Sequence, residues 1–269
     1  MTEFLTTPSG DRVAFDVRGE GPALIFVAGA GPVGREPQTV QTAELASAAG
    51  ITTLVYDRLG RGESEAGGTP SLDRELGALA ALIDRVGGSA ALCGHSSGCT
   101  IALAAATRGL PVTALALWEA PIEGESKDAG PWADEIARRL DAGDNAGALE
   151  YYMKDMPPEW LEGAKRAPFW PAMVAAAPSN RVDAESLAWA ESAPLRDLLG
   201  GLDIPVMTIV GAETMPLMTA ASQAIADAVP EAAQRSIPGA DHSWEPAPMA
   251  AALVELVQGA DERSDPAAV

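Results

Sequence analysis

Short apolar segments alternate with segments of helical length along the first half of the chain, and this alternation constrains the fold most strongly. The apolar runs lie at Ala23–Ala28, Thr52–Tyr56, Ala90–Cys93 and Val112–Leu117. Such runs, bounded by Gly and Pro, are typical of parallel strands that are buried on both faces. The segments of helical length between them are Thr39–Ala49, Leu72–Val86 and Gly98–Arg108. This order predicts right-handed crossover units and a mostly parallel α/β sheet with helices on both faces.

The alternation stops at residue 123 and resumes near residue 202. Between these positions no strand-like run occurs, prolines recur, and five of the six tryptophans lie in the segment or at its entrance. The chain therefore fits one α/β core, residues 1–122 and 202–269, into which residues 123–201 are inserted as a helical cap. Aromatic and methionine side chains favour a lid over an apolar pocket. The alternative is a segment that simply covers one face of the sheet.

The charge of the chain argues against several classes of partner. The formal net charge is −20, which repels nucleic-acid phosphates and anionic lipid headgroups. We therefore expect no nucleic acid and no membrane among the partners. No apolar stretch reaches the roughly 18 residues that span a bilayer, and the first ten residues lack the pattern of a signal peptide. We expect a cytoplasmic protein.

The cysteines and histidines are too few for a disulfide framework or a metal centre. Cys93 and Cys99 flank one predicted turn, and we interpret them as reduced packing residues. The chain has two histidines, His95 and His242, and no Cys/His cluster, so we expect no metal. The glycines of the segment 60–62 are followed by neither a lysine nor P-loop spacing. We expect no cofactor.

The segment Gly94-His95-Ser96-Ser97-Gly98 lies between a predicted strand and a predicted helix. A G-x-S-x-G sequence in this setting forms a sharp turn that exposes the serine hydroxyl at the carboxyl edge of the sheet. Glycines are needed at both ends because side chains there would collide with the neighbouring strand and helix. The helix N-terminus also favours negative charge next to the serine. We predict Ser96 as a nucleophile; the alternative is a serine-rich loop that caps a helix.

A serine nucleophile needs an adjacent base, and the chain offers two histidines. His95 is next to Ser96 on the turn, where we expect its side chain to point away. His242 lies in a loop after the last predicted strand, and that loop returns to the edge of the sheet where Ser96 stands. His242 is therefore the predicted base. Asp57 and Arg58 are expected to fix their own turn through local hydrogen bonds.

Four motifs, in chain order, resemble those of the α/β-hydrolase fold family. They are VAGAG at 27–31, YDRLGRGES at 56–64, GHSSG at 94–98 and GADH at 239–242. The family often has His-Gly in the first motif, and this chain does not. The resemblance covers nearly the whole chain and implies the α/β-hydrolase fold. It also implies an oxyanion hole built from the backbone N–H groups of Ala30 and Ser97.

The acid that would orient His242 departs from the usual family pattern. The family commonly has an aspartate after the strand predicted at 205–210, and this chain has Thr214 at that position, with Glu213 one residue away. Glu119 follows the strand 112–117 and could also reach the histidine. This arrangement is similar to that of zearalenone lactonases, which carry Glu-x-Pro after the corresponding strand. We predict Glu119 as the acid, with Glu213 as the alternative; Glu119 could otherwise be exposed or paired with an arginine.

Together these residues predict a cofactor-free serine hydrolase that cleaves a carboxylic ester or lactone of a small apolar substrate. Two alternatives remain: a lyase, cyclase or C–C-bond hydrolase on the same fold, in which His242 moves protons, and a hydrolase-derived ligand-binding protein. Possible substrate-binding residues are those with large side chains in or near the cap. They are Trp118, Tyr152, Met153, Trp160 and Trp189.

Overall fold

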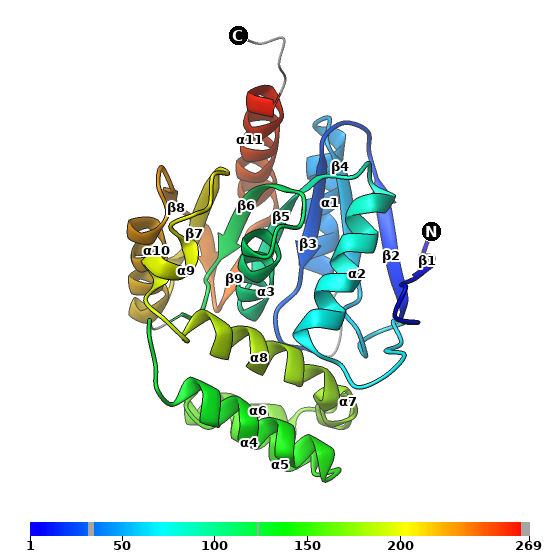
Figure 1. Cartoon of the computed structure of the whole chain (residues 1–269), viewed down its shortest axis with the longest axis vertical. Coiled ribbons are helices and arrows are strands. Elements are labelled where there is room, and N and C mark those ends of the chain that lie inside the picture. The colour runs from blue at the N-terminus through cyan, green and yellow to red at the C-terminus, as the bar shows by residue number, and fades with distance from the viewer. Residues whose placement is uncertain (32–34, 123, 265–269) are drawn as a thin grey trace.

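The computed structural model describes residues 1–31, 35–122 and 124–264, which contain a single sheet of nine strands in the order β1-β2-β4-β3-β5-β6-β7-β8-β9 (Figure 1). The strands are β1 (Glu3–Thr6), β2 (Arg12–Arg18), β3 (Ala23–Val27), β4 (Thr52–Tyr56), β5 (Ala90–His95), β6 (Val112–Trp118), β7 (Val206–Glu213), β8 (Ala233–Ala240) and β9 (Ser243–Trp244). Strands β3 to β8 pair in parallel, and antiparallel strands flank them on both sides.

Strand β3 shows why the central strands are continuous apolar runs. Its five residues are all buried, and their side chains alternate between the two faces of the sheet. Ala23, Ile25 and Val27 belong to one core cluster, whereas Leu24 and Phe26 belong to the cluster on the opposite face. Because both faces are covered, no position in the strand can be polar without losing its hydration.

Helices form a layer on each face of the sheet (Figure 1). One layer contains α1 (Pro37–Ala48) and α11 (Pro246–Ser264), which pack against each other. The other layer contains α2 (Leu72–Arg85), α3 (Ser97–Thr107) and α10 (Pro216–Ala228). The sheet thus has the three-layer arrangement that the sequence predicts, and the fold prediction is confirmed. The short edge strands β1 and β9 were not predicted, because their few residues carry no clear apolar pattern.

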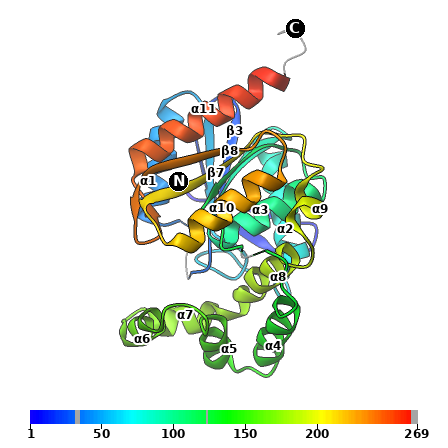
Figure 2. The same ribbon diagram turned by 90° about the vertical axis from the view of Figure 1, so that its left-hand side faces the viewer.

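The chain between β6 and β7 forms helices and contains no strand in its described residues. They are α4 (Ala129–Asp141), α5 (Asn145–Tyr152), α6 (Pro158–Arg166), α7 (Trp170–Ala176), α8 (Asn180–Ala190) and α9 (Leu195–Leu199), with a 3₁₀ turn at Ala177–Ser179. Figure 2 shows α4 to α7 as a separate outer layer, with α8 between that layer and the core. Val182 of α8 belongs to the main core cluster, whereas Ile136 and Tyr152 belong to a small cluster of their own. The inner helix is therefore part of the core, and the outer helices pack mainly on it.

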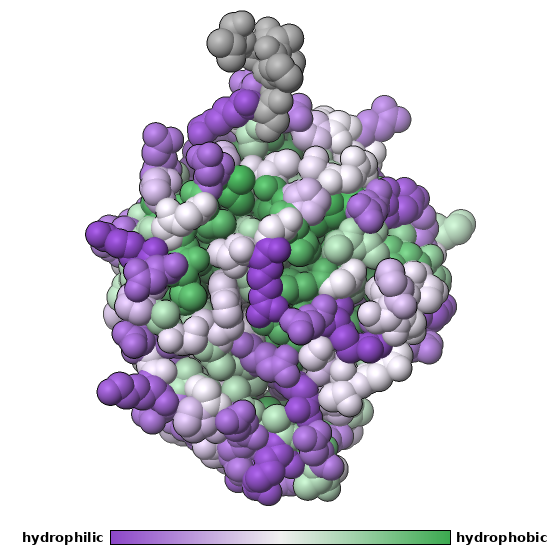
Figure 3. Space-filling view, viewed as in Figure 1, coloured by the Kyte–Doolittle hydropathy of each residue, from purple (hydrophilic) through white to green (hydrophobic). Residues whose placement is uncertain are grey.

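Hydrophilic side chains cover the outer helices and the rim of the face seen in Figure 3, and hydrophobic side chains gather in its middle, around α3. None of the described helices combines the length and the apolar character needed to cross a bilayer.

Candidate active site

The carboxyl ends of the parallel strands bring the predicted site residues to one edge of the sheet. Ser96 follows β5, Glu119 follows β6, and His242 lies in the turn between β8 and β9. This edge faces the inserted helices (Figure 1). Ligand sites of open α/β sheets form at this end of the strands, so the position is the expected one for a functional site.

Ser96 occupies a strained turn between β5 and α3. Its backbone has φ 54° and ψ −127°, a conformation that costs a non-glycine residue on the order of 1–3 kcal/mol. A Cβ atom on Gly94 would lie 2.5 Å from Cα of Cys99, and one on Gly98 would lie 2.1 Å from the carbonyl oxygen of Val27. Both glycines are therefore required by close packing against the helix and the strand, as predicted.

His242 lies in a two-residue hairpin turn. Ala240 pairs with Ser243, and the residues between them, Asp241 and His242, have φ of 51° and 64°. Positive φ at both central positions is typical of a type I′ turn, which matches the twist of a hairpin. The tight turn between β8 and β9 holds the histidine backbone at the edge of the sheet.

Nδ1 of His242 lies 2.6 Å from Oε2 of Glu119. A carboxylate can only accept a hydrogen bond, so Nδ1 donates and Nε2 retains its lone pair. The Glu119 side chain is 2% exposed, and its Oε1 accepts a hydrogen bond from the backbone N–H of Gly211 at 3.0 Å. The contact therefore orients the imidazole ring and selects its tautomer.

The surroundings of Glu119 keep its carboxylate ionised. Burial raises the pKa, but the His242 ring, the Thr214 hydroxyl and the Gly211 N–H outweigh burial, so the pKa of Glu119 lies below its ordinary value. An ionised carboxylate at this position can stabilise a positive charge on the histidine. The alternative acid, Glu213, is exposed at the end of β7. The structure thus brings Glu119 to His242 and leaves Glu213 in solvent.

The backbone carbonyl of His242 accepts two hydrogen bonds. Nε2 of His95 lies 3.0 Å from the carbonyl oxygen, and Nε1 of Trp118 donates to it at 3.2 Å. The rings of His95 and His242 have centroids 4.8 Å apart. Burial and the neighbouring His242 lower the pKa of His95 to about 4, so this ring is neutral near pH 7. His95 therefore supports the turn that carries His242.

The two predicted oxyanion donors lie next to Ser96. A Cβ atom on Gly29 would lie 2.9 Å from Cβ of Ser96, so the loop that carries Ala30 approaches the serine closely. The N–H of Ser96 donates to the carbonyl of Trp118 at 2.9 Å. Ser97 is the first residue of α3, where backbone N–H groups have no intrahelical partner. This arrangement suits Ala30 and Ser97 as donors to an oxygen bound at Ser96.

A buried group of charges lies behind this loop, and we call Arg58, Arg61 and Asp183 the arginine–aspartate cluster. The three side chains are at most 1% exposed. Nη1 of Arg58 donates to Oδ1 of Asp183 at 2.6 Å, and Arg61 binds the other oxygen of the same carboxylate. The local role predicted for Arg58 is therefore wrong. Asp57 does bond within its own turn, where it accepts from the N–H of Glu63 at 3.0 Å.

The five possible substrate-binding residues have different surroundings. Trp118 is fully buried and packs edge-on against Trp244, with ring centroids 5.4 Å apart; with its bond to the His242 carbonyl, this makes it a support for the histidine. Tyr152 and Met153 belong to the small cluster of the outer helices. Trp160 is 39% exposed on α6. Trp189 is partly buried and packs on the main core.

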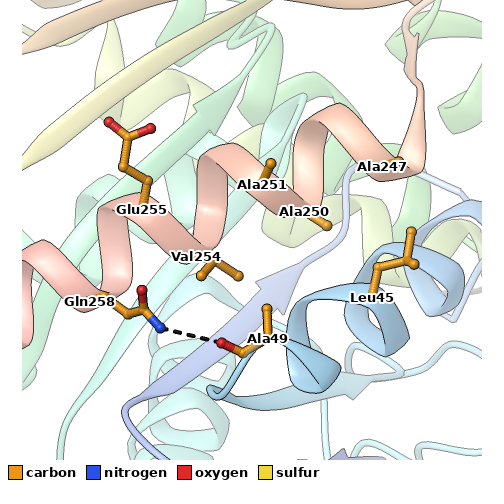
Figure 4. Close-up of a pocket in the computed structure, with 8 residues that line it drawn as sticks. All are labelled: Leu45, Ala49, Ala247, Ala250, Ala251, Val254, Glu255 and Gln258. Atoms are coloured by element: carbon orange, nitrogen blue, oxygen red, sulfur yellow. Dashed lines mark hydrogen bonds between the residues drawn. The ribbon is translucent and has the colours of Figure 1, made fainter.

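A surface hollow of about 520 Å³ lies between α1 and α11 (Figure 4). Its walls include Leu45, Ala250, Ala251 and Val254, and none of the residues discussed above lines it. The hollow is therefore separate from the site at the carboxyl edge. The described residues also bring together no group of three His, Cys, Asp or Glu side chains that could hold a metal ion.

Comparisons with known proteins place the chain in a family. Residues 24–256 match the profile of the alpha/beta hydrolase family, and the chain belongs to that family. No curated protein matches the chain.

Several solved structures are similar to the chain. An alpha/beta hydrolase from Sphaerobacter thermophilus is 28% identical, with a TM-score of 0.78 over 94% of this chain and 99% of that one. A thermophilic esterase from Thermogutta terrifontis is 24% identical, with a TM-score of 0.66 over 98% and 97% of the two chains. An enol-lactonase from Burkholderia xenovorans is 19% identical, with a TM-score of 0.56 over 98% and 100%. The last two likenesses concern the fold.

Proposed function

We propose that this chain is a serine hydrolase that cleaves a carboxylic ester or lactone of an apolar substrate. The proposed catalytic triad is Ser96, His242 and Glu119. The observation that carries the proposal is the 2.6 Å contact between Nδ1 of His242 and Oε2 of Glu119, at the sheet edge where Ser96 stands on its strained turn. Five non-glycine residues of the described chain have positive φ, and the three triad residues are among them. Strain of this kind gathers at functional sites.

The reaction begins with proton transfer from Ser96 Oγ to Nε2 of His242 as Oγ attacks the carbonyl carbon. The carbonyl electrons move to oxygen, and the N–H groups of Ala30 and Ser97 stabilise the resulting oxyanion. Glu119 stabilises the imidazolium. When the tetrahedral intermediate collapses, the C–O bond breaks and His242 gives its proton to the departing alcohol. Water then attacks the acyl-enzyme by the same route and releases the acid and the free serine.

The inserted helices define the substrate class in this proposal. Residues 123–201 act as a cap over the carboxyl edge, with Tyr152, Met153 and Trp160 as candidate contacts for the acyl group. These side chains are aromatic or apolar, which favours an apolar acyl group over a small polar metabolite. In a lactone, the departing alcohol would stay tethered to the acyl-enzyme, so product release would follow the second step.

The proposal is tested by hydrolysis of 4-nitrophenyl esters of increasing chain length and of lactones of increasing ring size. We expect turnover that rises with apolar chain length, and an acyl-enzyme visible by intact mass after rapid acid quench. Ser96→Ala should lower kcat by about 10⁶-fold, whereas Ser192→Ala, at an exposed serine, should leave kcat unchanged. If Ser96→Ala kept much of the activity, the hydrolase mechanism would be wrong and the role of His242 as a proton shuttle in another reaction would gain support.

A further inference from the structure

Packing does not explain why the arginine–aspartate cluster is buried. A buried ion pair loses the hydration of both charges, and apolar side chains of the same shape often stabilise a fold at least as well. Desolvation lowers the pKa of Arg61, with Arg58 adding to the effect. Arg58 also lies 3.5 Å from Glu75 through its Nε, so the cluster continues into the core. The reason for the cluster is better sought in the groups that its members bind.

Both arginines bind the backbone of the loop after β3. Nη1 of Arg61 donates to the carbonyl oxygen of Gly29 at 2.6 Å. Nη1 of Arg58 donates to the carbonyl of Ala28 at 3.1 Å and approaches that of Gly29 at 3.4 Å. The Gly29 carbonyl and the Ala30 N–H belong to the same planar peptide group, and in a trans peptide they point in opposite directions. The described chain contains no cis peptide bond. The arginines therefore direct the Ala30 N–H away from themselves.

The orientation of this peptide group has to be held in place, because a glycine lies on one side of it. Glycine permits backbone conformations that other residues avoid, so the group between Gly29 and Ala30 could turn over. If it did, a carbonyl oxygen would face the developing oxyanion and repel it. Two positive side chains bound to the Gly29 carbonyl oppose that rotation.

Asp183 connects the same cluster to the second donor. The hydroxyl of Ser97 donates to Oδ1 of Asp183 at 2.7 Å, and the carbonyl of Ser97 accepts from the Thr100 hydroxyl at 2.7 Å. The first residue of α3 is thus fixed through its side chain and its backbone. The Tyr152 side chain of α5 also interacts with the Ser97 hydroxyl. The carboxylate that balances both arginines therefore also holds the residue whose N–H is the second oxyanion donor.

We propose that Arg61, Arg58 and Asp183 are positioning residues that set the orientation of both oxyanion-hole peptide groups and connect that hole to α8. The inference rests on the proposed hydrolase function and extends it to residues that do not contact the reacting atoms. Because Asp183 belongs to the inserted helices, a displacement of α8 would change the oxyanion hole as well as the space for substrate.

The test compares variants of the cluster with a variant of another ion pair whose carboxylate is equally buried. Arg61→Lys keeps the charge but loses the planar fork of donors, and Asp183→Asn keeps the shape but loses the charge. The control is Asp11→Asn, because Asp11 is fully buried, accepts from Nε of Arg74 at 3.1 Å and lies at the β1–β2 turn. For each variant we would measure kcat and KM with a 4-nitrophenyl ester. We would also measure the melting temperature and the affinity for a trifluoromethyl ketone, which forms a tetrahedral oxyanion adduct, relative to its methyl ketone analogue.

We expect each cluster variant to lower kcat by between tenfold and about 10³-fold, the upper value being the loss of one donor. KM should change less than about threefold, and affinity for the trifluoromethyl ketone should fall in parallel with kcat while affinity for the methyl ketone stays the same. Asp11→Asn should lower the melting temperature without these losses. If Arg61→Lys does not fold, Asp183→Asn carries the same expectation.

Two results would contradict the inference, and they are distinguishable. If the wild-type protein turns over the ester but the cluster variants lose only thermal stability, as the control does, the positioning role is wrong and the proposed function stands. If the wild-type protein neither turns over the ester nor binds the trifluoromethyl ketone, the proposed function and the inference both fail.

Discussion

A glutamate directly follows β6 and another ends the neighbouring strand β7 at the same edge of the sheet, and the two glutamates have opposite surroundings. Glu119 after β6 is buried, accepts a hydrogen bond from Gly211 and lies 2.6 Å from Nδ1 of His242. Glu213 at the end of β7 is exposed. The type of side chain is the same, so the backbone that carries each glutamate decides which of them can act on the histidine.

The backbone differs in two respects. Glu119 has φ 45°, so the chain turns sharply at this residue and directs the carboxylate across the neighbouring strand. A Cβ atom on Gly211 would lie 3.2 Å from Oε1 of Glu119, so glycine at that position leaves room for the carboxylate. Glu213, in contrast, continues β7 and pairs with Ala240 of β8. Glu213, exposed at the end of β7, is therefore not directed inward as the turn after β6 directs Glu119.

The largest expected effect separates the two glutamates directly. Glu119→Gln should lower kcat by about 10⁴-fold, because the amide no longer selects the histidine tautomer or stabilises the imidazolium. Glu213→Gln should change kcat by less than about twofold, since an exposed side chain without a partner at His242 contributes little. Ester hydrolysis by both variants, with melting temperatures as a check on folding, measures the contrast. Equal losses of kcat in Glu119→Gln and Glu213→Gln would contradict the assignment of Glu119 as the acid.

A second experiment moves the carboxylate from the turn after β6 to the loop after β7. Thr214 stands where the family commonly has an aspartate, and its hydroxyl lies beside Glu119. In the Glu119→Gln background, Thr214→Asp should recover at least about tenfold in kcat, because a carboxylate returns to the surroundings of His242. Glu213→Asp in the same background is the control and should recover nothing. If only Glu213→Asp recovered activity, position 213, and not position 214, would be the one from which a carboxylate acts on His242.

The two histidines show the same contrast in a different property. His242 faces a carboxylate, whereas His95 binds a backbone carbonyl, and burial lowers the pKa of His95 from 6.5 to about 4. The unfolded chain therefore binds more protons at this position between pH 6.5 and pH 4, so the free energy of unfolding should fall as pH decreases through that range. The ring keeps partial contact with solvent, so we expect a loss on the order of 2 kcal/mol.

Urea unfolding of the wild-type protein and of His95→Gln at pH 7, 5.5 and 4 measures this loss. The glutamine can still donate to the His242 carbonyl but does not titrate. The unfolding free energy of the wild-type protein should therefore fall relative to that of His95→Gln as pH decreases. A difference that is constant across the three pH values would contradict the lowered pKa.

The smallest expected effect concerns the hydroxyl beside the acid. Thr214→Val removes that hydroxyl with little change in shape. The buried hydroxyl lies near Glu119 but has no hydrogen-bond partner of ordinary geometry among the described residues, so we expect kcat to fall less than about threefold, below the roughly 1 kcal/mol of a full hydrogen bond. The control is Thr219→Val, at an exposed position on α10, which should leave kcat unchanged. An unchanged kcat in Thr214→Val would limit the support of Glu119 to Gly211 and His242.

Sequence reasoning was most successful where the determinant is local. Continuous apolar runs and a five-residue segment with two glycines predict the parallel sheet and the strained turn that carries Ser96, because strand burial and turn sterics act within a few residues. The order of strands and loops in the chain then predicts that His242 and Glu119 lie at the carboxyl edge. The sequence indicates only that two glutamates are near; the φ of 45° at Glu119 and the space above Gly211 distinguish them.

The residues that support the site could not be predicted, because they lie far apart in the chain. Arg61 and Asp183 are 122 residues apart in the chain, and no motif relates them. The packing of α8 on the core brings them together. In the same way, His95 reaches the His242 carbonyl across 147 residues. Interactions of this kind depend on how the inserted helices and the final hairpin dock, which no local pattern encodes.

If Glu119 activates Ser96 through His242, the rate at which a fluorophosphonate labels Ser96, read by intact mass, should depend on Glu119. The rate of labelling would be compared for wild type, Ser96→Ala, Glu119→Gln and Glu213→Gln at equal probe concentration. We expect one adduct per chain in the wild type, none in Ser96→Ala, slowing by orders of magnitude in Glu119→Gln and an unchanged rate in Glu213→Gln. A wild-type protein that does not label, or slowing in Glu213→Gln instead of Glu119→Gln, would contradict the activation of Ser96 by Glu119.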